Sequence, residues 1–246
     1  MRNARAALLA AVLALALPVR PVSAGPEPAP PVRAVVEMFT SQGCSACLAA
    51  DRLAGEFSRE PGLLALTVPV TYWDYLGWKD TLAEHAFDER QRAYALQNRF
   101  HQLATPQAVV SGRELIPGSD RGRLSRLVAE SGPLPVRVKI CERNERIVID
   151  VEADANGRPA EIWLVPVARS RPVVIARGAN EGRVAVYANV VRGFHWVGTW
   201  TGAAARFELS RASARINGAD GYAVLLQAGG ANRAGRILGA AKGPGL

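Results

Sequence analysis

The sequence predicts an α/β domain followed by an all-β domain, joined near residues 131–134. In the first half of the chain, apolar runs typical of strands alternate with helix-like segments, whereas the second half contains short strand-like runs separated by turns. The charge also differs, because residues 33–131 carry 11 basic and 12 acidic groups and residues 132–246 carry 16 and 9. A Gly- and Pro-rich cluster at 131–135 suits neither a helix nor a central strand and marks the boundary.

The first half is predicted to form a sheet with helices on its faces. Because a helix separates its first two strands, we expect those strands to be parallel. In the second helix, Phe87, Tyr94, Leu96 and Phe100 are the side chains available to pack inward. The expected elements are strands at Arg33–Phe39 and Leu63–Val70, hairpin strands at Gln107–Val110 and Arg113–Ile116, and helices at Cys44–Phe57, Glu84–Phe100 and Asp120–Glu130.

The second half is predicted to form an antiparallel sandwich or barrel, because it shows repeated short β-rich runs without a convincing helix. Its basic residues are scattered singly rather than clustered with aromatic residues, which argues against binding to nucleic acid. The expected strands are Val136–Cys141, Arg146–Ala153, Glu161–Ala168, Val173–Ala176, Arg183–Val191, Arg206–Leu209 and Gly221–Gln227.

The N-terminus is typical of a secretory signal peptide at residues 1–24. Two arginines precede an uninterrupted apolar run from Ala6 to Leu17, and Val22 and Ala24 are the small residues that a signal peptidase accepts. An uncleaved anchor helix is the alternative, but twelve apolar residues span only ~18 Å. We therefore expect a secreted or periplasmic protein without stable membrane insertion after cleavage, followed by a Pro-rich tether at 25–32.

The candidate chemistry lies at Cys44-Ser45-Ala46-Cys47, where the predicted helix begins. A helix N-terminus favours the thiolate form of a cysteine, so Cys44 is the expected nucleophile and Cys47 the resolving thiol. A structural disulfide is the first alternative, although its four-residue ring constrains the unfolded chain very little. Half of a zinc site is the second, but no second CxxC and no paired histidines accompany it, so we expect no metal and no cofactor.

Thr105-Pro106 is a second candidate feature, because it follows a helix and directly precedes an apolar strand. An X–Pro bond at such a position can be cis, which exposes the preceding backbone groups to an extended substrate beside the cysteines. An ordinary trans-proline loop is the alternative. The position in the strand order favours the catalytic interpretation of both residues.

These residues resemble the thioredoxin superfamily, and more closely the secreted bacterial family known as domain of unknown function 1223. The resemblance implies a thioredoxin-like domain at 33–131, a β-rich domain at 134–246 and the cis form of Pro106. Gly43 replaces the Trp that usually precedes the first Cys of thioredoxins. The matching stretches are VVEMFTSQGCSAC (Val35–Cys47), YWDYLGWKD (Tyr72–Asp80), RQRAYA (Arg90–Ala95), TPQAVVSG (Thr105–Gly112) and NVVRG (Asn189–Gly193).

An aromatic segment after the second strand is the candidate substrate-binding surface. Trp73, Tyr75 and Trp78 lie close together in the sequence and follow a strand end where ligands of open α/β sheets bind. They are expected either to contact a substrate polypeptide near Cys44 or to fill the space between the helices and the β-rich half.

Four further residues carry weaker predictions. Glu37 and Asp51 could take a proton from Cys47, although a buried carboxylate in such a position is more often paired with a cation. Cys141 is expected to be a buried free thiol, and His101 is expected to be an exposed or core histidine rather than a partner of the cysteines.

The sequence thus favours an exported thiol–disulfide oxidoreductase whose partners are protein thiols or disulfides and a redox recycling partner. Two alternatives remain. One is a thioredoxin-like binding module that holds Cu(I) or a protein partner without redox turnover. The other is a scaffold in which the CxxC pair is a structural disulfide.

Overall fold

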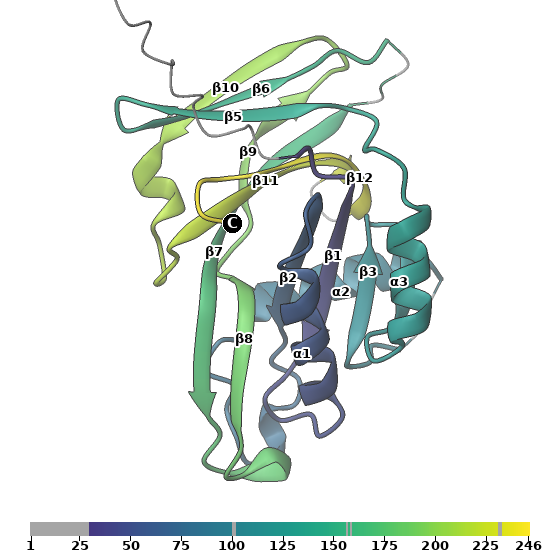
Figure 1. Ribbon diagram of the computed structural model, residues 1–246, viewed down its shortest axis with the longest axis vertical. Coiled ribbons are helices and arrows are strands. Elements are labelled where there is room, and N and C mark those ends of the chain that lie inside the picture. Colours follow the sequence, from purple (N-terminus) through teal and green to yellow (C-terminus); the bar gives the residue numbers. More distant parts are fainter. Residues whose placement is uncertain (1–29, 100–101, 156, 158, 231–232) are drawn as a thin grey trace, which may run out of the picture.

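The computed structural model describes residues 30–99, 102–155, 157, 159–230 and 233–246. The predicted signal peptide, most of the tether, Phe100 and His101 lie outside these residues. Strands from both halves of the chain form one nine-stranded mixed sheet, and three further strands form a small antiparallel sheet (Figure 1).

The first half contains a sheet between two helical layers. The parallel pairing of β1 with β2 and the hairpin of β3 and β4 are confirmed. The helices α1 and α3 pack on one face of β1, and α2 packs on the other (Figure 1). The elements are β1 (Ala34–Thr40), α1 (Cys47–Phe57), β2 (Leu63–Pro69), the 3-10 turn η1 (Asp74–Leu76), α2 (His85–Gln97), β3 (Gln107–Val110), β4 (Glu114–Pro117) and α3 (Arg121–Glu130).

The second half contains strands and short 3-10 turns. Sequence patterns did not indicate β9 or β12, and they split β7 into two runs. Its elements are β5 (Val138–Arg143), β6 (Arg146–Val151), β7 (Ala160–Val174), η2 (Gly178–Asn180), β8 (Val184–Val191), β9 (His195–Trp200), β10 (Ala205–Ser210), η3 (Arg211–Ala214), β11 (Gly221–Gly230) and β12 (Arg233–Lys242).

The large sheet continues across the predicted boundary between the two halves. Its strand order is β12-β11-β7-β8-β2-β1-β3-β4, with β9 also paired to β7, and β8 runs parallel to β2. The 15-residue β7 makes this possible, because its first part pairs with β11 and its second part with β8. Pairing with β11 ends at Val167, so Pro172 lies on an edge of the sheet, where its missing N–H is tolerated.

In the second half, three strands form a small antiparallel sheet, and the other strands belong to the large mixed sheet. The antiparallel sheet β10-β6-β5 packs over the end of the large sheet (Figure 1). Ile147 and Ile149 from the small sheet meet Leu164 and Trp200 from the large one in a shared core. The strands of the second half are therefore not all in one separate sheet, because β7, β8, β9, β11 and β12 belong to the same sheet as β1 and β2.

Two details of the helices also differ from the expectation. The first helix begins at Cys47, because Cys44 and the two residues after it form a turn in which the N–H of Cys47 donates to the carbonyl of Cys44 (3.2 Å). The second helix ends at Gln97, and Leu96 is 70% exposed rather than packed. Within the described residues, no helix combines the length and apolar character needed to span a membrane.

Candidate functional site

Cys44 and Cys47 form a disulfide at the junction between β1 and α1. Their Cα atoms are 5.4 Å apart, and Cys47 is the first residue of α1. Cys44 is 3% exposed and Cys47 is fully buried, whereas Ser45 and Ala46 between them are exposed. The pair therefore lies just beneath the surface, with Cys44 as the outer sulfur.

The structure brings Cys44 next to the Thr105–Pro106 turn. The Sγ atom of Cys44 is 3.6 Å from the carbonyl oxygen of Thr105, and the Thr105–Pro106 peptide bond is cis. Thr105 and Pro106 are both half-buried. Two segments that are 61 residues apart in the sequence thus meet at one sulfur atom.

The start of α1 provides a favourable environment for negative charge. No side chain caps the helix at Ala46, and the first turn of α1 contains no acidic residue. The N–H of Cys47 already donates to the Cys44 carbonyl, so the N–H groups that follow it and the positive end of the helix dipole are what α1 offers to a thiolate at Cys44. In general, a cysteine at the N-terminus of a helix is more readily ionised than a free thiol.

Asp51 lies one turn beyond Cys47 on the same face of α1 and is 2% exposed. Its Oδ1 accepts a hydrogen bond from the hydroxyl of Thr40 (2.6 Å), and its Oδ2 has no hydrogen-bond partner among the described residues. Burial, opposed in part by the Thr40 hydrogen bond, raises the pKa of Asp51 to about 7. The carboxyl can therefore gain or lose a proton near neutral pH.

The three candidate aromatic side chains of the segment Tyr72–Asp80 lie in different surroundings. Trp78 packs against buried residues beneath β8, and its Nε1 donates to Oε1 of Gln42 (2.8 Å). Trp73 donates from Nε1 to the hydroxyl of Thr105 (2.7 Å) and lies in the space that a side chain at Gly43 would need. Tyr75 lies on η1 and is 78% exposed.

Glu37 is not available for proton transfer with the cysteines, because Arg90 and Tyr94 occupy both of its oxygens. The Nε of Arg90 donates to Oε1 at 2.5 Å, and the hydroxyl of Tyr94 donates to Oε2. Burial alone would lower the pKa of Arg90, but Glu37 and Tyr94 together outweigh burial and raise that pKa. The prediction that a cation pairs with this carboxylate is confirmed.

Cys141 is a free thiol in β5, half-buried rather than fully buried as expected. The remaining candidate, His101, lies outside the described residues. In the part of the chain that the structure describes, no group of three or more His, Cys, Asp or Glu side chains converges as a metal site.

The family model described as "Protein of unknown function (DUF1223)" matches residues 35–227 of the chain. The protein belongs to the DUF1223 family. The matched region includes the Cys44–Cys47 pair, the Thr105–Pro106 turn and the strands from β1 to β10. No curated protein gives a significant match.

Two solved structures resemble this DUF1223 protein. Protein AGR_C_4864 from Agrobacterium tumefaciens has 32% sequence identity and a TM-score of 0.77, with 88% of this chain and 96% of that chain covered. HBP35 of Porphyromonas gingivalis has 12% identity and a TM-score of 0.57, with 88% and 76% covered. The second likeness is one of fold alone.

Three polar residues around the cysteines of the DUF1223 protein were missed by the sequence patterns. The backbone N–H of Gln42 donates to Oδ2 of Asp80 (2.7 Å), and the Asn180 side chain donates to the carbonyls of Gln42 and Cys44. Burial raises the pKa of Asp80 to about 6, although hydrogen bonds from the backbone N–H groups of Gln42, Leu82 and Ala83 oppose the shift. Asp80 lies in one of the stretches that carry the family resemblance, but nothing in the sequence links Asn180 to residues more than 130 positions away.

Proposed function

We propose that this protein is an exported thiol–disulfide oxidoreductase that exchanges electrons with protein thiols through Cys44 and Cys47. The observation that carries the proposal is the position of Cys44, at the uncapped start of α1 and 3.6 Å from the Thr105 carbonyl. The order β1-α1-β2-α2-β3-β4-α3 supports a thioredoxin-like domain in the first half. A disulfide kept only for stability would not need this contact with the Thr105–Pro106 turn.

The proposed reaction begins with the reduced pair and a substrate disulfide. The Cys44 thiolate attacks one substrate sulfur, which forms a mixed disulfide and releases the other substrate sulfur as a thiolate. The Cys47 thiolate then attacks Cys44, which re-forms the Cys44–Cys47 disulfide and releases the second substrate thiol. The substrate gains two electrons and the protein loses two, and the reverse sequence oxidises a substrate dithiol.

Asp51 is the proposed proton acceptor for Cys47 during the second step. Cys47 is fully buried, so its proton needs a nearby acceptor before the sulfur can attack. Asp51 is buried one helical turn away, its Oδ2 has no partner among the described residues, and its pKa is about 7. A carboxyl with such a pKa is ionised in part at neutral pH and can accept the proton.

The proposed substrate surface consists of Tyr75, Trp73 and the Thr105–Pro106 turn. Tyr75 is exposed, and Trp73 connects η1 to Thr105 through its indole N–H. Exposed aromatic side chains provide apolar contact with a polypeptide while their polar groups form hydrogen bonds. Trp78 is not part of this surface, because it packs beneath β8.

The proposed location is the periplasm or the exterior of the cell, after cleavage following Ala24. Disulfides persist in such oxidising compartments, where a redox partner must restore the reactive form of the pair. The N-terminal sequence of the protein recovered from the cell envelope tests this. A mature chain that begins at Gly25 supports export, and a chain that retains residues 1–24 contradicts cleavage.

Replacing Cys44 with Ser tests the reaction, with Cys141→Ser as the matched control. We expect Cys44→Ser to abolish insulin reduction and oxidative refolding of a reduced protein, because it removes the attacking sulfur. The control variant removes a free thiol far from the pair and should retain both activities. Retained activity in Cys44→Ser would exclude Cys44 as the nucleophile.

The reduction potential of the pair distinguishes catalysis from a structural disulfide. A value above about −300 mV together with exchange activity supports the proposal. A value below it, with no activity in the wild type, would show that the pair only stabilises the fold.

A further inference from the structure

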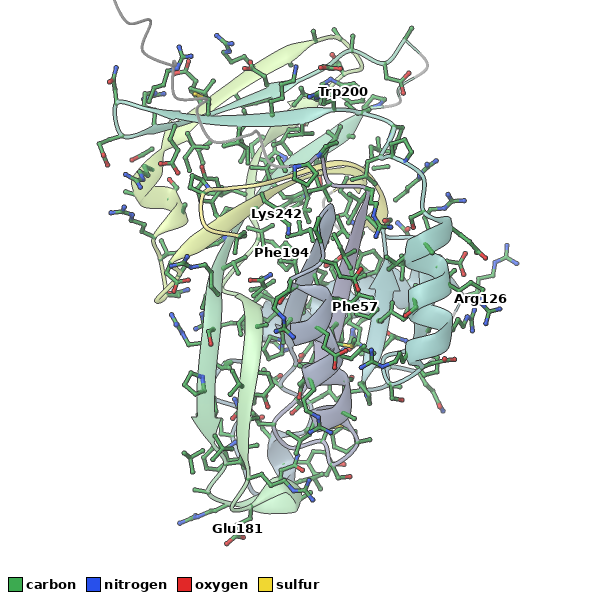
Figure 2. All side chains as sticks on the ribbon, viewed as in Figure 1. Phe57, Arg126, Glu181, Phe194, Trp200 and Lys242 are labelled. Carbon is green, nitrogen blue, oxygen red and sulfur yellow. A yellow bond between two sulfur atoms is a disulfide. The ribbon has the colours of Figure 1, made fainter. Side chains whose placement is uncertain are left out.

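The connection between β7 and β8 reaches from the second half of the chain to the loop between β1 and α1, residues 41–46, which contains Cys44 and is called the cysteine loop below. The connection contains η2 (Gly178–Asn180) at its tip. Figure 2 labels the next residue, Glu181, at one end of the molecule, opposite the end that contains Trp200. Glu181 is exposed, but the adjacent Asn180 is only 1% exposed. At the tip of this hairpin, the Asn180 side chain therefore points into the protein.

Asn180 uses its amide group to hold two backbone carbonyls of the cysteine loop. Its Nδ2 donates to the carbonyl oxygens of Gln42 and Cys44, each at 2.9 Å. The Cys44 carbonyl also accepts from the N–H of Cys47 (3.2 Å), the hydrogen bond that closes the turn before α1. Asn180 thus supplies the second donor to the carbonyl around which the Cys44–Cys47 turn is built.

The tip also contacts Trp78 of the aromatic segment, which is hydrogen-bonded to the cysteine loop. Gly178 has a φ of +79° and lies so close to Trp78 that a Cβ atom there would be 3.3 Å from the Trp78 Cβ. Trp78 in turn donates to the Gln42 side chain. The hairpin tip, the aromatic segment and the cysteine loop therefore contact one another, and Asn180 is hydrogen-bonded directly to the turn that carries Cys44.

We propose that Asn180 is a positioning residue of the redox site, which fixes the Cys44 carbonyl and thereby the turn that places the Cys44 sulfur at the positive end of α1. The inference rests on the proposed redox function. It assigns part of the reactivity of Cys44 to the second half of the chain, which supplies neither cysteine. Asn180 acts through the Cys44 carbonyl, because its hydrogen bonds are made to backbone carbonyls and not to a sulfur atom.

The test compares Asn180→Ala and the nearly isosteric Asn180→Leu with the wild type. Both variants lose the two donors, and Leu keeps most of the packing volume. Asn189→Ala is the matched control, because Asn189 is also buried and donates from Nδ2 to a backbone carbonyl, that of Ala65 (3.0 Å), away from the cysteines. All four proteins are compared by urea unfolding, by the pH profile of Cys44 alkylation in the reduced form, and by equilibration with glutathione.

We expect the Asn180 variants to lose about threefold in thiolate fraction of Cys44 at neutral pH, the size of a typical helix-terminus effect. Because the reduced form is then less stabilised, the reduction potential should become more negative by about 15 mV, which is the same threefold change at about 30 mV per tenfold. Asn189→Ala should lower stability while leaving the alkylation profile and the potential unchanged.

An alkylation profile and potential that match the wild type, with only stability reduced, would overturn the positioning role. A wild type without exchange activity would instead overturn the proposed function itself, so the two failures are distinguishable. If neither Asn180 variant folds, hydrogen exchange of the wild type decides, since coupling between two sites is reciprocal. Residues 178–182 should then differ in protection between the oxidised and reduced forms, and identical protection would refute the coupling.

Discussion

Replacing Asp51 with Asn should make the stability of the protein less dependent on pH between about pH 5 and pH 8. Burial raises the pKa of this carboxyl from its ordinary 3.8 to about 7, so the folded state binds a proton that the unfolded state has released. The contribution of Asp51 to stability is therefore largest at acid pH and falls as pH rises from about 4 to 7. Between about pH 5 and pH 9, the wild type should lose about 3 kcal/mol through this group.

In Asp51→Asn the Oδ1 acceptor for Thr40 remains, and the amide replaces a carboxyl oxygen that has no partner among the described residues. An unpaired buried amide donor costs about 1–3 kcal/mol at every pH. The variant is thus expected to be about as stable as the wild type or less stable near pH 5, and to gain about 3 kcal/mol relative to it by pH 9.

Urea unfolding of the oxidised proteins across this pH range measures the difference, because the intact disulfide keeps the thiols from titrating. The exposed Glu130→Gln serves as a control and should differ from the wild type by less than about 0.5 kcal/mol throughout. A stability difference between Asp51→Asn and the wild type that does not change with pH would refute the reasoning.

Other variants separate the roles of the residues around the site. Trp78→Ala should lower stability by about 1–3 kcal/mol, because it removes packing beneath β8 and the bond to Gln42; an unchanged urea midpoint would contradict that packing role. Tyr75→Ala should leave the urea midpoint nearly unchanged and slow exchange with protein substrates, whereas equal rates would remove Tyr75 from the proposed surface. Glu37→Gln should cost about 3–5 kcal/mol, since it leaves the buried Arg90 guanidinium without its counter-charge, and thermal unfolding tests this.

The elements of the first half were predictable because each has a strong local signal. The apolar runs at β1 and β2, and the helical spacing after Cys47, occur within short windows and match the observed elements within a few residues. The turn at Ser111 and Gly112 was equally clear, and both residues have positive φ (48° and 67°). Elements that depend mainly on local sequence preferences were therefore predictable from the sequence.

The second half was less predictable because its strands depend on their neighbours. The glycines of β12 weaken its strand signal, but the backbone of Ala228 in β11 approaches Gly235, and the backbone of Val136 before β5 approaches Gly239, too closely for a side chain. Packing between distant segments, rather than propensity, decided these cases.

The amino-acid order by itself determined the chemistry that is available: two thiols at CxxC spacing, a strand before them, a helix after them and a Thr-Pro pair before a later strand. Only the tertiary structure decided which groups surround Cys44. The Thr105 carbonyl beside its sulfur and the Asn180 amide bonded to its carbonyl come from segments 61 and 136 residues away. The reason is physical. Local periodicity reports which face of an element is buried, whereas hydrogen bonds between distant loops depend on how the whole sheet is assembled.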